Sequence, residues 1–310
     1  MGTSTGLELE LLHNFTVSTA STFSLDPSIR TLWRVDVPKI GFSTPYILNG
    51  IMALSALHMA RFDQGRRTYL LNRSTQYQTA SLKEALPLIP SITTQNCSHL
   101  FLFGVLTLLT NLASPIKEDD ILVVGSGVVP KWLFLLRGIY ALIQAEEKTL
   151  RSSAISLIFR ATATTREFWS SHIPVENEML SELEAGIHTR TRNEQAKQDI
   201  LLEALEALKR SYTFSDNYRF KEQGKLRGVY QWLFAISDGY LKLLKDMDNE
   251  ALCILAYFSI LLRELEKYWW IEGWGVHLIK RIYHMLDDQY RLYIRPAVEE
   301  IGWVPEASWR

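Results

Sequence analysis

Cysteine is scarce in this chain of 310 residues, which contains only Cys97 and Cys253. The two lie far apart in the sequence, and neither takes part in a CxxC pair or in a Cys and His spacing that would hold zinc. The sequence therefore provides neither a disulfide framework nor a metal cluster. This cysteine usage fits a reduced, intracellular setting.

Charge of one sign is also lacking, since 33 Lys and Arg residues stand against 34 Asp and Glu residues and the formal net charge is -1. Proteins that bind DNA or RNA usually carry an excess of basic residues, so we expect no direct nucleic acid binding by this chain. The best membrane candidate, Leu100–Leu112, is shorter than the ~20 residues that a span requires and includes Thr107, Thr110 and Asn111. We interpret it as a buried core helix and expect no membrane span.

Motifs of the common enzyme classes are missing too. The chain contains no GxSxG elbow, no HExxH and no Walker sequence. The acidic pairs Asp119-Asp120 and Asp287-Asp288 invite comparison with the magnesium sites that hold a diphosphate in terpene cyclases. Neither pair is followed by a carboxylate at the next helical turn. We therefore expect no cofactor and no metal.

Helical periodicity dominates what is present. Strand patterns are essentially absent, and neither a fixed repeat nor a persistent heptad occurs. The fold class is therefore predicted to be all-α. We expect one large helical domain over residues 1–310, with about ten helices and with residues 148–193 as a mobile region of loops and short helices.

Three segments show how the pattern translates into elements. A hydroxyl residue followed by Pro45 is typical of a helix start, and the many small residues of Pro45–Phe62 predict a central, closely packed helix. Ile29–Gly41 contains proline and favours an extended connector. The apolar spacing over Phe220–Lys245 predicts one long helix.

The strongest helical pattern runs from Asp248 to Trp274. Apolar residues recur every three or four positions as far as Leu265, which produces one broad apolar face, and Asp248 can cap the first turn. The pattern breaks at Trp269–Gly275, where three tryptophans lie beside two glycines and one helix must turn into another. So much aromatic surface must pack against other side chains or against a ligand.

Aromatic residues gather in this late group of helices, and two interpretations are open. They form either an aromatic core or the wall of an apolar pocket in the C-terminal half of the chain, since small-molecule sites combine apolar walls with a few polar groups. The candidate pocket residues are Tyr230, Trp232, Phe234, Tyr257, Phe258, Trp269, Trp270 and Trp274. The candidate polar contacts to a ligand are His277 and Tyr268.

Three separated stretches, Gly6–Thr22, Pro45–Arg61 and Gly273–Val304, resemble the regulatory domain of fungal zinc-cluster transcription factors of the sterol-uptake regulator type. Their order and spacing extend the match over nearly the whole chain. The resemblance implies an all-helical domain that senses an apolar sterol in a pocket of its C-terminal half and tends to dimerise. We therefore expect a sterol-like or terpenoid small molecule and a second copy of the chain, in a homodimer, as partners.

The chain departs from that family in one respect. The family places a cysteine-rich, DNA-binding zinc-cluster module ahead of this domain, whereas Met1 stands here five residues before the first matching stretch. We expect either a part of a longer regulator, which would act in the nucleus, or a free-standing copy of the domain in the cytoplasm.

Two other functions remain open. A free-standing copy would allow a biosynthetic enzyme whose pocket catalyses a cofactor-free cyclisation or isomerisation of a terpenoid or polyketide. In a Diels–Alder reaction, such a pocket would act by holding the reacting groups in a near-attack geometry. Tyr268 or His277 would then donate a hydrogen bond to a carbonyl group. A dimerisation scaffold with a filled core is the third interpretation.

Overall fold

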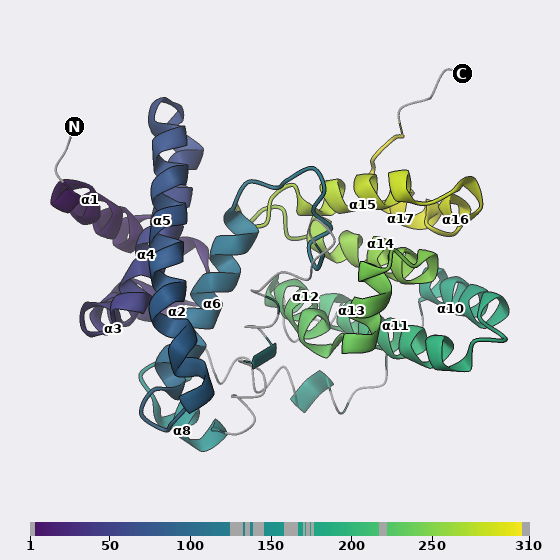
Figure 1. Ribbon diagram of the computed structural model, residues 1–310, viewed down its shortest axis with the longest axis horizontal. Coiled ribbons are helices and arrows are strands. Elements are labelled where there is room, and N and C mark those ends of the chain that lie inside the picture. Colours follow the sequence, from purple (N-terminus) through teal and green to yellow (C-terminus); the bar gives the residue numbers. More distant parts are fainter. Residues whose placement is uncertain are drawn as a thin grey trace. The chain divides into compact units, whose positions relative to one another are not determined.

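The computed structural model describes residues 4–124, 146–157, 177–216 and 222–305, with residues 133, 137–138, 167–169, 171 and 174 between these ranges. All regular elements in these ranges are helices, as Figure 1 shows. The prediction of an all-α fold is therefore confirmed.

The internal contacts of the chain define two compact units. Unit 1 comprises Met1–Pro115, Lys131–Thr164 and Tyr268–Trp270, and unit 2 comprises Ile116–Pro130, Thr165–Lys267 and Ile271–Arg310. The single domain expected over residues 1–310 stays a prediction.

Unit 1 is built around α4. Its helices are α1 (Ser4–Val17), η1 (Thr19–Thr22), α2 (Pro27–Thr31), η2 (Leu32–Asp36), α3 (Val37–Ser43), α4 (Pro45–Phe62), η3 (Gln64–Arg66), α5 (Arg67–Ala85), η4 (Leu86–Ser91), α6 (Cys97–Ala113) and α8 (Glu147–Ser152). α4 packs against α1, α3, α5 and α6, and most of its side chains are buried. The prediction that Pro45–Phe62 forms a central helix is confirmed.

Small residues let the neighbours of α4 approach closely. A Cβ atom at Gly50 would lie only 3.2 Å from Leu106 Cδ1 of α6. On the α5 side, Ser74 Oγ donates a hydrogen bond to Ala53 O at 2.8 Å. Both contacts require a short side chain at the point where two helices meet.

The prediction of an extended connector over Ile29–Gly41 is wrong, because α2, η2 and α3 follow one another as continuous helical backbone. Pro38 has no N–H group to donate to the carbonyl group one turn before it, and the backbone adapts by a π-helical turn in η2. In this turn the Val37 N–H group donates to Leu32 O. Proline therefore widens the helix here without ending it.

Unit 2 is built around α14. Its helices are α10 (Glu178–Arg190), α11 (Gln195–Asp216), α12 (Glu222–Ala235), α13 (Asp238–Lys245), α14 (Asn249–Arg263), α15 (Trp274–Met285), α16 (Asp288–Tyr293) and α17 (Arg295–Ile301). α14 packs against all the others in this list, most extensively against α15, α11 and α17 (Figure 1).

The prediction of one long helix over Phe220–Lys245 is wrong in one respect, because α12 and α13 are separate helices. Ser237 Oγ accepts a hydrogen bond from Tyr240 N at 3.2 Å and so caps the start of α13. A hydroxyl residue inside an apolar pattern thus restarts the helix. Phe220 itself lies outside the described residues.

The region expected to hold loops and short helices, residues 148–193, contains most of α8 and all of α10. Much of the remainder lies outside the described residues. Among the described helices, none is both long and apolar enough to cross a membrane. The described part of the chain also contains no group of three or more His, Cys, Asp and Glu side chains that could hold a metal ion.

Candidate functional site

α14 begins at a capped turn and continues as a buried helix. Asp248 Oδ1 accepts a hydrogen bond from Ala251 N at 3.0 Å, which is the cap that the sequence predicts. Every residue from Glu250 to Leu262 is buried. α14 therefore brings both large aromatic rings and one carboxylate, Glu250, into the interior of unit 2.

We define the unit 2 aromatic cluster as the buried residues Trp232, Tyr240, Tyr257 and Phe258, and two of its candidate pocket residues, Trp232 and Phe258, are in ring contact. The Trp232 and Phe258 rings stack with centroids 4.0 Å apart, and the Tyr240 ring meets Trp232 edge-on at 5.9 Å. All four side chains are at most 1% exposed. Ring contacts of this kind contribute ~0.5–1.5 kcal/mol beyond the burial of the rings, so they hold α12, α13 and α14 together.

The polar atoms of this cluster already have main-chain partners. The bonds are Trp232 Nε1 to Ala204 O (3.3 Å), Tyr240 Oη to Ala251 O (2.9 Å) and Tyr257 Oη to Tyr293 O (2.9 Å). Burial raises the pKa of Tyr240 and of Tyr257, so both remain protonated donors. The proton of each indole and phenol group in the cluster is therefore used within the protein.

Tyr230 and Phe234, two further candidates, lie on α12 and are half-buried. They are four positions apart and share one face of the helix, whereas Trp232 lies between them and points to a different face. A role for these residues and for the unit 2 aromatic cluster as a pocket wall stays a prediction.

Charged side chains surround the start of α14. Glu250, which is 4% exposed, accepts hydrogen bonds from Tyr290 Oη at 2.6 Å, Lys197 Nζ at 3.0 Å and Arg190 Nε at 3.4 Å. Lys197 Nζ also lies 2.6 Å from Asp248 Oδ2. We call Arg190, Lys197, Asp248, Glu250 and Tyr290 the Glu250 cluster. It places two acidic and two basic groups together, so their charges offset one another.

The protonation states in the Glu250 cluster follow from these bonds. Burial alone would raise the pKa of Glu250, but the bonds from Tyr290 and Lys197 outweigh it and hold the pKa below its ordinary value. Burial and the bond to Glu250 raise the pKa of Tyr290 to about 12. Burial would lower the pKa of Lys197, but Asp248 and Glu250 raise it. Glu250 and Lys197 are therefore ionised at neutral pH, and Tyr290 is a protonated donor.

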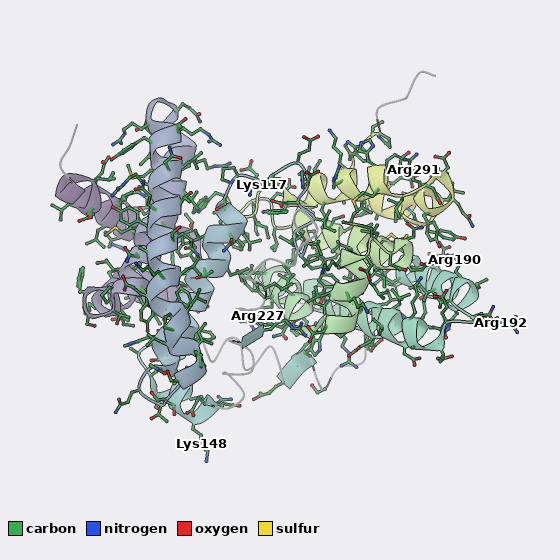
Figure 2. The ribbon with its side chains drawn as sticks, viewed as in Figure 1. Lys117, Lys148, Arg190, Arg192, Arg227 and Arg291 are labelled. Atoms are coloured by element: carbon green, nitrogen blue, oxygen red, sulfur yellow. The ribbon has the colours of Figure 1, made fainter. Side chains whose placement is uncertain are left out.

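Arg190 joins this cluster to two aromatic faces. Its guanidinium carbon lies 3.9 Å from the centroid of the Tyr293 ring and 5.4 Å from that of Tyr290. The two terminal nitrogens have no hydrogen-bond partner among the described residues. Since an aromatic face attracts a cation, these rings stabilise the charge in place of hydrogen bonds. Figure 2 shows Arg190 at the carboxyl end of α10.

Trp274 and His277 lie in the first turn of α15. The two rings meet edge-on with centroids 6.0 Å apart. His277 Nε2 donates to Asp120 O at 2.8 Å, because a carbonyl oxygen can only accept. Gly273 precedes the helix with a φ of 86°, a left-handed conformation that glycine adopts at no steric cost. Nε2 of His277 therefore forms a hydrogen bond within the protein. Nδ1 takes no part in this bond.

Tyr268, Trp269 and Trp270 belong to unit 1, and together with His58 we call them the aromatic corner. The Trp269 and His58 ring centroids lie 4.6 Å apart, and Trp269 Nε1 donates to Thr22 Oγ1 at 2.9 Å. Trp270 stacks on Tyr268 with centroids 5.6 Å apart and an interplanar angle of 26°. The three consecutive aromatic residues thus form two separate ring contacts.

Trp270 differs from Trp232 and Trp269 in the state of its indole proton. It is 1% exposed, yet its Nε1 atom has no hydrogen-bond partner among the described residues. A buried donor without a partner costs about 1–3 kcal/mol. Among the candidate pocket residues, Trp270 is therefore one whose polar atom has no partner among the described residues.

A neutral polar network lies beside the corner, and we call it the unit 1 polar network. Asn14 Nδ2 donates to Ser55 Oγ at 2.9 Å and to Thr19 Oγ1 at 3.1 Å, and Ser55 Oγ donates to Leu11 O at 2.7 Å. Thr19 Oγ1 lies 2.9 Å from His58 Nδ1. Thr19 Oγ1 also lies 3.4 Å from Asn14 O, to which its hydroxyl can donate, so the direction of its bond with His58 Nδ1 follows from the ring tautomer.

His58 is neutral in this setting. Burial lowers its pKa to about 4, and the charge of Arg61 acts in the same direction. The ring is 7% exposed and lies between Trp269 and the ring of Phe62, whose centroid is 5.3 Å away. At neutral pH the aromatic corner therefore consists of uncharged rings.

The structure divides the predicted site residues between the two units. Tyr230, Trp232, Phe234, Tyr257, Phe258, Trp274 and His277 lie in unit 2, whereas Tyr268, Trp269 and Trp270 lie in unit 1. Sequence reasoning missed Glu250 and His58. The sequence does mark each of them as unusual. Glu250 is a carboxylate within an apolar helical pattern, and His58 lies among the small and apolar residues of α4.

The comparison with protein families identifies the class of protein. The model of the fungal specific transcription factor domain matches residues 10–266. Because this match covers most of the chain, the chain belongs to that family, which forms the regulatory region of fungal Zn(2)-C6 transcription factors.

Individual relatives agree with the family. The chain is 23% identical over 322 aligned residues to a Zn(2)-C6 fungal-type transcription factor of Gibberella zeae, which covers 98% of this chain and 64% of the relative. It is 28% identical over 147 residues to the Zn(2)-C6 fungal-type transcription factor afumD of Aspergillus fumigatus, covering 47% of this chain and 38% of the relative. A shorter match, 33% identical over 60 residues, links 19% of this chain with 8% of Sterol uptake control protein 2 of Candida albicans. The chain spans less than two thirds of the length of each of these relatives.

Proposed function

We propose that this chain is the ligand-responsive part of a fungal transcription regulator that acts in the nucleus. Its ligand is an uncharged, apolar small molecule of the sterol or terpenoid class, and it binds at the aromatic corner of unit 1. Membership of the family supports the regulatory role. The binding role rests on Trp270.

The observation that carries the proposal is the unpaired indole proton of Trp270. The side chain is 1% exposed, and Nε1 lacks a hydrogen-bond partner in the described part of the chain. A filled core would leave this cost of about 1–3 kcal/mol in place, whereas a ligand oxygen near Nε1 would remove it. The ligand therefore needs a hydrogen-bond acceptor such as a hydroxyl or carbonyl oxygen.

The chemistry of the surrounding rings favours an uncharged ligand. Trp269, Trp270 and Tyr268 offer aromatic faces, and His58 carries no charge at neutral pH because burial lowers its pKa to about 4. Apolar walls with one directed polar group are typical of small-molecule sites. A rigid hydrocarbon with one oxygen, as in a sterol or a terpenoid alcohol, matches that description. The partial similarity to a sterol uptake control protein supports the same class.

Native mass spectrometry tests the proposal directly. The purified chain is incubated separately with ergosterol and with the diterpene alcohol sclareol, and we expect a complex with one ligand per chain. The Trp270→Phe variant keeps an aromatic ring but loses the donor, so its affinity should fall about tenfold, as expected for one hydrogen bond. The masses of the ligand-free protein also show whether the chain forms the homodimer that the family resemblance implies.

Trp33→Phe is the matched control, because Trp33 lies in unit 1, is 4% exposed and contacts the Phe23 ring edge-on at 4.9 Å. The same change there should leave the affinity unaltered. Equal binding by both variants, or no complex with either ligand, would contradict the proposal and would make Trp270 a core residue. Recovery of a rearranged compound of unchanged mass would instead favour an isomerising cyclase.

A further inference from the structure

α16 is an exposed segment between two buried anchors. Leu286 before it is 1% exposed, and Ile294 after it is 0% exposed. None of the residues of α16 itself is buried. The neighbouring helices α15 and α17 each bury several apolar side chains. Because hydrophobic burial is the main source of local stability, α16 is held less firmly than the helices on either side of it.

Polar contacts attach α16 to α14. Tyr290 Oη donates to Glu250 Oε1 at 2.6 Å, and Tyr257 Oη donates to Tyr293 O at 2.9 Å. The guanidinium group of Arg190 also lies over the Tyr293 ring at 3.9 Å. These contacts depend on direction and distance, so they are lost together when α16 moves by a few ångströms.

A different contact holds α16 on its other side. Arg291 Nε donates to Tyr283 O of α15 at 2.9 Å, and the guanidinium group lies 4.7 Å from the centre of the Tyr283 ring. Figure 2 labels Arg291 on α16. This bond also depends on direction and distance, so it is broken with the others when α16 moves as a unit.

Glu250 and Tyr257, the two residues of α14 that bond to α16, lie on either side of Cys253 along the helix. Glu250, Cys253 and Tyr257 are spaced by three and then four residues, so they share one face of the helix. The Cys253 side chain is 0% exposed. Its electrostatic neighbours include Glu250, Arg190 and Asp287, the residue that caps α16. Cys253 therefore lies on the face of α14 that carries both residues bonded to α16, Glu250 and Tyr257.

We propose that α16 is a latch over this face of α14, with Glu250 as its attachment point. The segment releases as a unit while Leu286 and Ile294 stay in place, and its release uncovers the face formed by Glu250, Cys253 and Tyr257. This gives the regulatory domain a segment that moves without unfolding of its core. The proposal concerns unit 2 and is independent of ligand binding at the aromatic corner.

The thiol of Cys253 provides a built-in reporter. In a Cys97→Ser background it is the one cysteine left in the chain, and its labelling by an excess of a maleimide measures how often α16 opens. Tyr290→Phe removes the bond to Glu250 and keeps the ring beside Arg190. We expect labelling to become roughly 10- to 100-fold faster, as the loss of one hydrogen bond to a carboxylate predicts. Tyr257→Phe should act in the same direction.

Tyr240→Phe is the matched control. Tyr240 also donates a buried bond to a carbonyl oxygen of α14, at 2.9 Å from Ala251 O, but the bond does not involve α16. This variant should lower the stability of unit 2 without a matching increase in labelling. Hydrogen exchange read by mass spectrometry should show faster exchange in residues 287–294 of Tyr290→Phe and not in α15 or α17. If all three tyrosine variants accelerate labelling only in proportion to their loss of global stability, Cys253 is exposed by global unfolding and the latch does not exist.

Discussion

The two units bury polar groups in different ways. In unit 1, the polar network of Asn14, Thr19, Ser55 and His58 is neutral, and its bonds join α1 and η1 to α4. In unit 2, the Glu250 cluster is ionised, and its bonds join α10, α11 and α16 to the start of α14. The neutral network is made of short side chains, whereas the ionised cluster needs the long reach of arginine and lysine.

This difference predicts how the stability of each unit responds to the removal of a charge and to a lower pH. A neutral bond contributes about 1 kcal/mol and is nearly independent of pH until one member gains a proton. A buried ion pair contributes little against an apolar replacement but is costly to break on one side. Unit 2 should therefore be the more sensitive to single charge removals, and unit 1 should respond first to mild acid.

The largest effect is expected for Glu250→Ala. The change leaves Arg190 without its carboxylate partner and Tyr290 without its acceptor, so the free energy of unfolding should fall by about 3–5 kcal/mol. Urea unfolding followed by tryptophan fluorescence measures it. Glu299→Ala is the control, since Glu299 pairs with Arg295 where the two side chains are 61% and 71% exposed, and it should change stability by no more than ~0.5 kcal/mol. Equal effects of the two changes would remove the contrast between the cluster and the surface.

The second largest effect is a loss of stability in mild acid, which we expect to arise from His58 in unit 1. The pKa of His58 is about 4 in the folded chain and 6.5 ordinarily, so the unfolded chain binds an extra proton between these values. The stabilisation is complete above pH 6.5 and is lost as the pH falls towards 4, by up to about 3 kcal/mol. Unfolding midpoints in urea from pH 7 to pH 4 measure the loss.

His58→Asn is the variant that isolates the contribution of His58 to this loss, because the Asn amide can donate to or accept from Thr19 but does not titrate in this range. The slope between pH 6.5 and 4 should largely disappear. Glu250 acts in a lower window, since its folded pKa lies below the ordinary 4.5 and its contribution is lost as the pH falls through that folded value. A His58→Asn variant that keeps the full slope would show that other groups cause the acid sensitivity.

A smaller effect is expected for Asn14→Ala. The change removes the donor to Ser55 and Thr19 but leaves Ser55 bonded to Leu11 O and Thr19 beside His58, so about 1–2 kcal/mol of stability should be lost. Calorimetric melting at pH 7 measures the shift, with the exposed Asn72→Ala as the control. A loss above the one caused by Glu250→Ala would reverse the comparison between the neutral network and the charged cluster.

Apolar periodicity predicted the two central helices well. Pro45–Phe62 and the helix that Asp248 caps follow from spacing, small residues and a cap, all of which act over a few positions. The connector over Ile29–Gly41 was predicted wrongly because a proline can be accommodated by a π-helical turn when the flanking backbone is packed. The break at Ser237 was missed because its cap competes with an unbroken apolar pattern.

The candidate site was only partly predictable. The aromatic richness of residues 230–274 is visible in the sequence, but the partners of each ring depend on tertiary packing. Trp269 bonds to Thr22, 247 positions away, and no local pattern indicates this contact. Whether a buried donor has a partner is likewise a property of the packed unit, which is why Trp270 could not be distinguished from Trp269 by sequence.

The measurement that tests the proposed site most directly is the indole N–H spectrum of the chain labelled with 15N-tryptophan, recorded with and without ergosterol. The chain has nine tryptophans, and Trp270→Phe assigns the signal of interest. Ligand should shift the Trp270 signal downfield as Nε1 gains an acceptor, while Trp232, already bonded to Ala204 O, stays in place. An unmoved Trp270 signal together with a shifted Trp232 signal would contradict the account and would move the ligand to the unit 2 aromatic cluster.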